Sequence, residues 1–496
     1  MSGDVRSQDF SSFFLSIHND LFNGETKVTP FRSVEDNTTD GTNTVIQKFL
    51  FANSKLYGMG RVSSGSDLIK IYEKSGDVIT TGWTASANGA SSGRATSPRV
   101  FVAYKGGASS TFLYGFDGGA SVIWAYDTAG GAGAFKETAL SVSHTVGSFG
   151  LVTSDDLLLM AYDNKIAVKD GGTAHNDNWE AARLTLPANF RIVDLEEHGS
   201  FVAITCISLS SSLANSVTFL WDKVSPDVFE PINIGSGEGI LSASIDGELL
   251  IVATSQGSAK ALRNKLVLRK YIGGRSSEVL QEIDTEGAIS SLGYGLKVKD
   301  GNRMSFVVST TIDGVARNNM WTIGRLKPGL PFRLTMSQNL NNDTQPTSVD
   351  GVFKYGGYYF FAINGGTVTR TNNDDAYTAT STHITQKING ESRLEGASRF
   401  NKVLKWAGIT CPPLPAGSSL VLAYRVNETT SWTTIFTLTT ANALAYQQGI
   451  DAAGADFLQF KEIQFKLTTT GGTALPADWS SIDFEYEILD NTTEEL

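Results

Sequence analysis

The 496-residue sequence has few charged residues and no long apolar runs. Charged residues make up 18% of the chain, against about 25% in an average domain. No stretch approaches the ~20 consecutive apolar residues that a membrane helix needs, so we predict no membrane span. Basic residues never occur in a run longer than two, and the formal net charge is -11. A nucleic-acid-binding surface needs a basic face, so we expect nucleic acid not to be the main partner.

Cysteine and secretory features are also scarce. The two cysteines, Cys206 and Cys411, each lie in an apolar run typical of a strand. We interpret them as small buried apolar residues rather than a disulfide, which fits synthesis in a reducing cytoplasm. The opening residues MSGDVRSQDF lack a basic segment followed by an apolar stretch, so we predict no secretory signal.

Sequence motifs for catalysis or metal binding are lacking. There is no HExxH, GxSxG or phosphate-binding loop. NETTSWTTIF (427–436) is the segment most similar to a sialidase Asp box, but it lacks the Asp and the Gly. We therefore predict no catalytic, cofactor-binding or metal-ligating residues, no cofactor, and a protein that is not an enzyme. The histidines are isolated from one another: His18, His144, His175, His198 and His383.

Acidic residues and polar loops leave alternatives open. A glycosidase needs two carboxylates on either side of a sugar, and a propeller can supply them from its inner strands. Asp-rich turns such as DGG could bind Ca²⁺, but plain turns are the simpler interpretation. The loops 169–179 and 371–382 could be binding surfaces or solvated connections. The carboxylates that we consider, and expect in turns or at strand edges, are Asp155, Asp156, Asp194, Glu196, Glu197 and Asp246.

Turn formers and aromatic residues are abundant. The chain has 50 Gly, 27 Phe, 15 Tyr and 8 Trp residues. Frequent turn residues argue against long helices, while the aromatic residues can fill a large core. This composition predicts an all-β protein.

A repeated pattern extends from residue 44 to residue 387. In each unit a strand and a turn precede a strongly apolar strand, such as LLLMAY, FVAITC, LLIVAT or YYFFAI. These strands lack period-2 alternation, so we expect both of their faces to be buried, with a more alternating outer strand after them. The apolar strands recur roughly every 40–50 residues, which predicts a β-propeller of about seven blades. Two large β-sandwiches with Greek-key connections are the alternative.

The two ends of the chain follow different patterns. Residues 1–43 are polar and irregular apart from the apolar segment FSSFFLSI (10–17). We predict an extended N-terminal arm that could contribute one strand. Residues 388–496 contain long alternating strands and predict one C-terminal β-sandwich. Its expected core residues are Tyr424, Trp432, Phe436, Phe465 and Phe484.

The order of these regions resembles virion structural proteins of tailed bacteriophages. The resemblance depends on FRSVEDNTTDGTNTVIQKFLFANSKLYGMG, on the repeated units, and most specifically on the ending. There ESRLEGASRFNKVLKWAG precedes LVLAYRVNETTSWTTIF, FKEIQFKLTTTGG and IDFEYEI. In that group a propeller with a C-terminal β-sandwich occurs in tail-associated and tail-nozzle or adaptor components.

The resemblance implies a non-enzymatic structural component of a virion, in the tail. Such a protein would be made in the host cytoplasm and located in the virion. It would assemble as a homo-oligomer with other virion proteins, and a host surface glycan is a further candidate partner. The alternatives are a carbohydrate-binding or host-receptor-recognition module and a propeller glycosidase or sialidase-like enzyme.

Overall fold

The structure is a computed structural model that describes most of the chain in two compact units. The propeller unit comprises Val34–Met320 and Leu340–Thr371, and the sandwich unit comprises Met1–Ser33, Trp321–Asn339 and Asn372–Leu496. The described residues are 2–8, 13–17, 19–20, 29–30, 34–36, 44–62, 68–74, 84–85, 100–116, 122–130, 134–142, 148–209, 216–229, 231–234, 237–255, 265–285, 289–291, 296–312, 315–325, 329–338, 340, 346–364, 367–371, 377, 380–389, 400–427, 429, 431–449, 458–471 and 475–489.

Among its described residues the propeller unit contains six four-stranded antiparallel sheets and one further group of strands, counted below as the sixth sheet, that belongs to a ten-stranded sheet. The first three sheets are β6 (Thr44–Ala52), β7 (Lys55–Val62), β8 (Leu68–Lys74), β9 (Thr84–Ala85); β10 (Val102–Tyr104), β11 (Phe112–Phe116), β12 (Val122–Asp127), β13 (Phe135–Ser141); and β14 (Ser148–Val152), β15 (Leu157–Tyr162), β16 (Lys165–Asp170), β17 (Trp179–Thr185). The next two are β18 (Phe190–His198), β19 (Phe201–Ser208), β20 (Val217–Trp221), β21 (Ile232–Asn233); and β22 (Gly239–Ile245), β23 (Glu248–Ser255), β24 (Lys265–Gly273), β25 (Ser276–Asp284). The sixth contains β26 (Ser290–Ser291), β27 (Lys297–Asp300), β28 (Arg303–Ile312) and β29 (Val315–Gly324), and the seventh contains β31 (Val349–Tyr355), β32 (Tyr358–Ile363), β33 (Thr367–Thr371) and β5 (Val34–Asp36).

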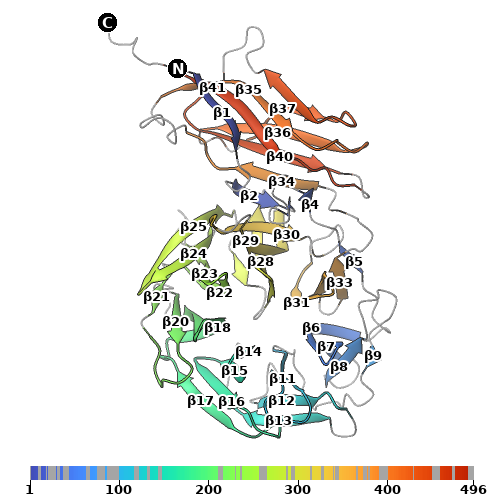
Figure 1. Ribbon diagram of the computed structural model, residues 1–496, viewed down its shortest axis with the longest axis vertical. Coiled ribbons are helices and arrows are strands. Elements are labelled where there is room, and N and C mark those ends of the chain that lie inside the picture. Colours follow the sequence, from blue (N-terminus) through green and yellow to red (C-terminus); the bar gives the residue numbers. More distant parts are fainter. Residues whose placement is uncertain are drawn as a thin grey trace. The chain divides into compact units, whose positions relative to one another are not determined.

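The first strands of neighbouring sheets contact one another around a common axis (Figure 1). The contacts run from β6 to β10, β14, β18 and β22, continue through β28 and β27 to β31, and return from β31 to β6. The predicted β-propeller of about seven blades, with a β-sandwich encoded after it, is therefore confirmed.

Apolar clusters fill the spaces between neighbouring sheets. In one of them, Leu159 and Ile166 of the third sheet pack with Ile204 and Phe219 of the fourth. The second strands β15, β19, β23 and β32 are almost entirely buried, as their unbroken apolar sequences predicted. The following strand is also buried, for example β20 at every residue, so the expectation that it is the outer strand was wrong. A fourth strand such as β17 is the exposed one.

The seventh sheet is completed by a strand from near the N-terminus. β5 pairs with β33, with Thr371 opposite Val34. The strands β31, β32 and β33 are encoded near the end of the propeller unit, and their outer neighbour β5 is encoded at its beginning. This pairing covers an edge that would otherwise be open for association with another chain.

The sandwich unit consists of two sheets and a small hairpin. One sheet has the order β1 (Ser2–Gln8), β41 (Ser481–Ile488), β35 (Lys402–Thr410), β38 (Ala445–Gly449), with β39 (Gln459–Phe460) also pairing with β35. The other has the order β30 (Arg333–Gln338), β2 (Phe13–Ile17), β34 (Thr380–Thr385), β40 (Ile463–Thr470), β36 (Ser419–Val426), β37 (Thr433–Leu438), and the hairpin is β3 (Asn19–Asp20) with β4 (Thr29–Pro30).

The sandwich core follows the period-2 pattern of its strands. On β41, Ile482, Phe484 and Tyr486 are buried while the alternate acidic residues face outward. The expected core residues Phe436, Phe465 and Phe484 are in the core, and Tyr424 packs against it.

Trp432 is a correction to that core assignment. Its ring lies under the Arg425 guanidinium, 4.6 Å from the ring centroid, and the Lys466 ammonium, 4.8 Å away. An indole flanked by two cations belongs to a partly exposed surface rather than to an apolar core.

The N-terminal segment and the domain boundaries differ from the expected arrangement. Residues 1–43 contribute β1, β2 and β5 to three sheets, where an extended arm that could contribute one strand was predicted. β34 belongs to the sandwich unit although it precedes residue 388. Polar or short sequences such as those of β1 and β5 form strands when neighbouring strands supply the hydrogen bonds, which local sequence cannot reveal.

Two further expectations concern the cysteines and the membrane. Cys206 and Cys411 are free and buried, as predicted. Burial raises the pKa of both thiols. In the described part of the chain, no helix is long and apolar enough to span a membrane.

Replacement of Gly351 by alanine should destabilise the propeller. A Cβ at Gly351 would lie 2.5 Å from the backbone oxygen of Gln47, where β31 meets β6. Because the neighbour is backbone, the strands must move apart, at a cost of about 1–3 kcal/mol. Thermal unfolding monitored by circular dichroism would measure the loss. Gly449→Ala, at a site with nothing within 4 Å of the new Cβ, is the control, and equal effects of the two variants would contradict the prediction.

Candidate functional site

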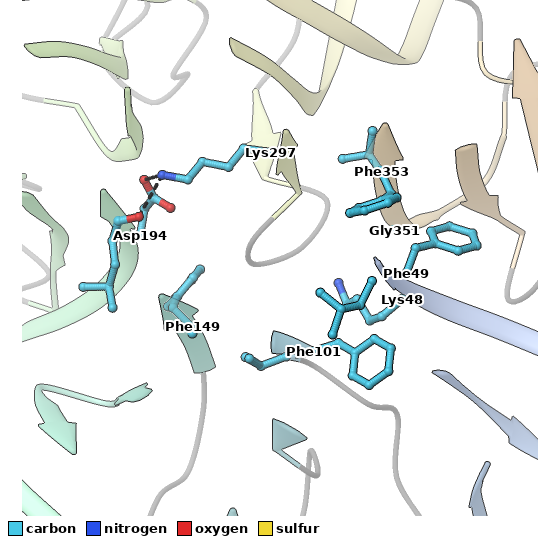
Figure 2. Close-up of a pocket in the computed structure, with 13 residues that line it drawn as sticks. Lys48, Phe49, Phe101, Phe149, Asp194, Lys297, Gly351 and Phe353 are labelled. Atoms are coloured by element: carbon cyan, nitrogen blue, oxygen red, sulfur yellow. Dashed lines mark hydrogen bonds and ion pairs between the residues drawn. The ribbon is translucent and has the colours of Figure 1, made fainter. Parts of the chain in front are cut away.

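A cavity of about 220 Å³ lies among the first strands of the propeller (Figure 2). Residues of β6, β14, β18, β27 and β31 line it, together with Val100 and Phe101 just before β10. Phe49 and Phe149 line the cavity but are nearly buried in the apolar clusters between sheets. The prominent polar feature of the cavity is Lys297, which extends toward Asp194 in Figure 2.

Lys297 links three sheets of the propeller. Its Nζ donates hydrogen bonds to Asp194 Oδ2 at 2.7 Å and to Glu196 Oε2 at 2.8 Å, both on β18. It also donates to the backbone oxygens of Leu195, at 2.8 Å, and Ser242, at 3.0 Å. The carboxylates accept backbone N–H bonds in turn, Asp194 from Ser242 and Glu196 from Ser244. The four acceptors that share the three N–H donors of the ammonium compensate for its removal from water.

The protonation equilibria of this cluster are shifted. Burial raises the pKa of Asp194 to about 6, against the opposing effect of Lys297. For Lys297, burial alone would lower the pKa, but Asp194 and Glu196 outweigh it and raise the pKa. At neutral pH the cluster therefore contains a charged Lys297 beside an ionised Asp194.

The six carboxylates considered from the sequence separate into three groups. Asp194 and Glu196 come together at Lys297, and they lie on β18, an edge strand of its four-stranded sheet, which agrees with the expected edge position. Asp155 and Glu197 meet at the buried ammonium of Lys223. The remaining pair, Asp156 and Asp246, lie in turns with positive φ, as expected.

The loop 169–179, considered as a binding surface, folds around a lysine. The side chain of Lys169 is almost fully buried and donates hydrogen bonds to the backbone oxygens of Ala174 and Asp177. Trp179 Nε1 and the Tyr114 hydroxyl both donate to the His175 backbone oxygen. An ammonium thus occupies the centre of a turn rich in carbonyl groups, which agrees with the interpretation of DGG as a plain turn. Most of the other loop, 371–382, lies outside the described residues.

The described histidines are separated from one another. His198 Nδ1 lies 3.0 Å from Ser244 Oγ. His383 is buried against the Trp479 ring, and burial lowers its pKa to about 3. His18 and His144 lie outside the described residues. Within the described part of the chain, no three His, Cys, Asp or Glu side chains converge in a group that could hold a metal.

A second candidate site is a groove of about 490 Å³ on the sandwich unit. It lies over β41, β35 and β38, on the face of the sheet opposite the core. The β-ladder aligns Trp406 with Glu485 and Gly408 with Asp483, and it aligns Gly408 with Gln447 on the other side. Since alternate residues point to the same face, these side chains surround a position where glycine leaves the sheet surface open.

Gly408 also fixes the distance between two strands of the groove. A Cβ there would lie 2.8 Å from the Tyr446 backbone oxygen of β38. Glycine therefore permits the close approach of β38, which carries Gln447 and the half-exposed Tyr446.

The groove side chains are oriented by hydrogen bonds. Trp406 Nε1 donates to Glu485 Oε2 at 2.6 Å. Asp483 Oδ2 accepts from the hydroxyls of Thr410, at 3.1 Å, and Ser481, at 2.9 Å. The partly exposed indole and the two carboxylates are thus held in place before any ligand arrives, which lowers the entropic cost of binding. Sequence analysis missed this groove because its residues come from three separated strands.

Comparisons with known proteins find similarity at the level of structure only. No family model matches the chain, and no curated protein matches it. An exo-beta-1,3-galactanase from Phanerochaete chrysosporium has a TM-score of 0.31 and 10% identity, covering 93% of this chain and 100% of its own. YCF48 from Cyanidioschyzon merolae has a TM-score of 0.41 and 12% identity, covering 68% of this chain and 98% of its own. A Mycobacterium tuberculosis puromycin-hydrolyzing peptidase has a TM-score of 0.44 and 8% identity, covering 71% and 61%.

These similarities correct one sequence-based prediction. The absence of catalytic motifs predicted that the protein is not an enzyme. The solved structures to which the chain is similar include glycoside hydrolases, with 8–10% identity. The prediction is therefore withdrawn, because the missing motifs do not exclude catalysis in a fold of this kind.

Replacement of Lys297 by methionine should destabilise the propeller strongly. Methionine retains the apolar stem but removes the ammonium, so Asp194 and Glu196 remain buried without their cation. Breaking a buried pair in this way costs about 3–5 kcal/mol. Urea unfolding at neutral pH would measure the change.

Lys55→Met provides the matched control for this measurement. Lys55 forms an ion pair with Glu73 at 2.7 Å, but its side chain is 47% exposed. Loss of an exposed pair costs about 0–1 kcal/mol. Losses of the same size in the two variants would show that the buried cluster contributes no more than a surface pair.

Proposed function

We propose that the protein binds carbohydrate, and that the groove of the sandwich unit is the binding site. The observation that supports the proposal is the convergence of Trp406, Asp483, Glu485 and Gln447 around the open position at Gly408. The proposal concerns recognition by the groove and is independent of whether the propeller catalyses a reaction.

The chemistry of the groove suits a sugar ring. A pyranose has a face of C–H groups, which stacks on an aromatic ring, and a rim of hydroxyls. Carboxylates and amides bind such hydroxyls because they accept several hydrogen bonds in one plane. A few oriented polar groups beside an apolar platform are typical of small-ligand sites.

Substitution of Trp406 by alanine should abolish most of the binding. The indole supplies the apolar platform and holds Glu485. We expect wild-type protein to bind members of an oligosaccharide array, and Trp406→Ala to weaken calorimetric binding at least about tenfold, which corresponds to about 1.4 kcal/mol.

Trp432→Ala is the matched control for this experiment. Trp432 is also partly exposed on the sandwich unit, but it precedes β37 in the other sheet and does not line the groove. Its removal should leave glycan affinity unchanged, with thermal unfolding used to verify that both variants are folded. Absence of binding to any glycan, or an equal loss in both variants, would refute the proposal.

A place in the tail of a phage-like particle is a second candidate. The sequence resemblance implies a propeller and a C-terminal sandwich, and the presence of both supports this proposal. In that setting the protein would assemble as a homo-oligomer with other virion proteins, and the groove would bind a glycan on the host surface.

The assembly state tests this second proposal. We expect native mass spectrometry to detect a homo-oligomer, and immunogold electron microscopy to locate the protein on the tails of particles that encode it. A monomer at all concentrations, together with unlabelled particles, would contradict it.

A further inference from the structure

The groove contains hydrogen-bond acceptors that the protein itself does not use. Each carboxylate is anchored through one oxygen, Asp483 through Oδ2 and Glu485 through Oε2. Among the described residues, no donor reaches the second oxygens, Asp483 Oδ1 and Glu485 Oε1. These two atoms are therefore oriented and available to a ligand.

The charge of the groove is one-sided. Its lining residues include two carboxylates and, within the described part of the chain, no lysine or arginine. Such a site repels carboxylated or sulfated sugars and attracts a cation. The Trp406 ring adds to this preference, because the face of an indole attracts an ammonium group.

The propeller of the same chain shows what this acidic pair can bind. Asp194 and Glu196 are separated by one residue on a strand, with the buried Leu195 between them. Both bind the single ammonium of Lys297, at 2.7 and 2.8 Å. An Asp and a Glu on one face of a strand can thus share one ammonium between them.

The groove repeats this arrangement without the lysine. Asp483 and Glu485 are likewise separated by one residue, the buried Phe484, on one face of β41. The residues opposite them on β35, Gly408 and Trp406, carry no cation. Among the described side chains of the groove, none takes the place that Lys297 takes in the propeller.

We infer that the groove selects amino sugars, with the protonated amine between Asp483 and Glu485 and the sugar ring on Trp406. This inference rests on the proposed carbohydrate binding and specifies its ligand class. The preferred ligand is a saccharide with free amines, such as a glucosamine oligomer. Acetylation of the amine removes its charge, so the N-acetylated oligomer is the poorer ligand.

Calorimetry with four hexasaccharides tests the inference at a pH where the amine is protonated. The probes are glucosamine, N-acetylglucosamine, glucose and galacturonate oligomers. The full chain should bind the glucosamine hexamer about tenfold tighter than the N-acetylated and neutral hexamers, from one Coulombic contact and one cation–π contact. Galacturonate should bind most weakly. Added salt should reduce the affinity for glucosamine more than that for the neutral hexamer.

The double variant Asp483→Asn/Glu485→Gln keeps the shape of the groove and removes its charge. It should bind the glucosamine and neutral hexamers within about twofold of each other. Glu282→Gln, which removes one charge from an exposed ion pair of the propeller unit, should retain the full preference. If the double variant fails to fold, the salt dependence of the wild-type protein gives the same answer.

The outcomes separate this inference from the proposal on which it rests. Equal binding of neutral and glucosamine hexamers by the wild-type protein overturns the amino-sugar preference and leaves carbohydrate binding intact. A preference that persists in the double variant places the amine elsewhere and also overturns the inference. Binding of none of the four probes refutes both.

Discussion

The burial of apolar strands between neighbouring sheets is the constraint on which the propeller depends. A single four-stranded sheet of this chain cannot bury both of its faces. Clusters such as the one joining Leu159 and Ile166 with Ile204 and Phe219 bury the faces of two sheets at once. Each sheet therefore needs neighbours on both sides, and the only arrangement without an exposed end is a ring. The polar cluster at Lys297 lies inside this ring and joins three of its members.

The propeller was predictable because its repeat is a property of local sequence. The unbroken apolar strands, such as LLLMAY and YYFFAI, indicate burial on both faces without knowledge of their neighbours. The strands β1 and β5 were not predictable in this way. Their sequences are polar or short, and each becomes a strand through pairing with residues more than 300 positions later. The apolar segment that forms β2 did indicate a strand, but not its pairing with β34. Trp432 was misassigned for a related reason, since aromatic character alone does not distinguish a core from a surface covered by two cations.

The candidate site was less accessible to sequence analysis than the fold. Asp194 and Glu196 were recognised as carboxylates of interest, but their partner Lys297 is about 100 residues away and carried no signal. Trp406, Asp483 and Gln447 come from three strands that are adjacent only in the folded sheet. The predicted core position of Phe484 on β41 agrees with the outward face that its neighbours Asp483 and Glu485 share. The sequence could not predict that Gly408 of β35 lies opposite Asp483, where the missing side chain leaves the sheet surface open.

The pairing of the two chain ends affects how the protein can be made. β1 pairs with β41, with Ser2 opposite Glu487, and β5 pairs with β33. The residues of β1 must therefore wait until the residues of β41 have been synthesised before their sheet is complete. Sheets formed from such distant segments are slow to assemble. The early sheets of the propeller can form during translation, but the seventh sheet needs β33 and the sheet of β1 needs β41, so a chain that lacks these strands leaves open sheet edges exposed.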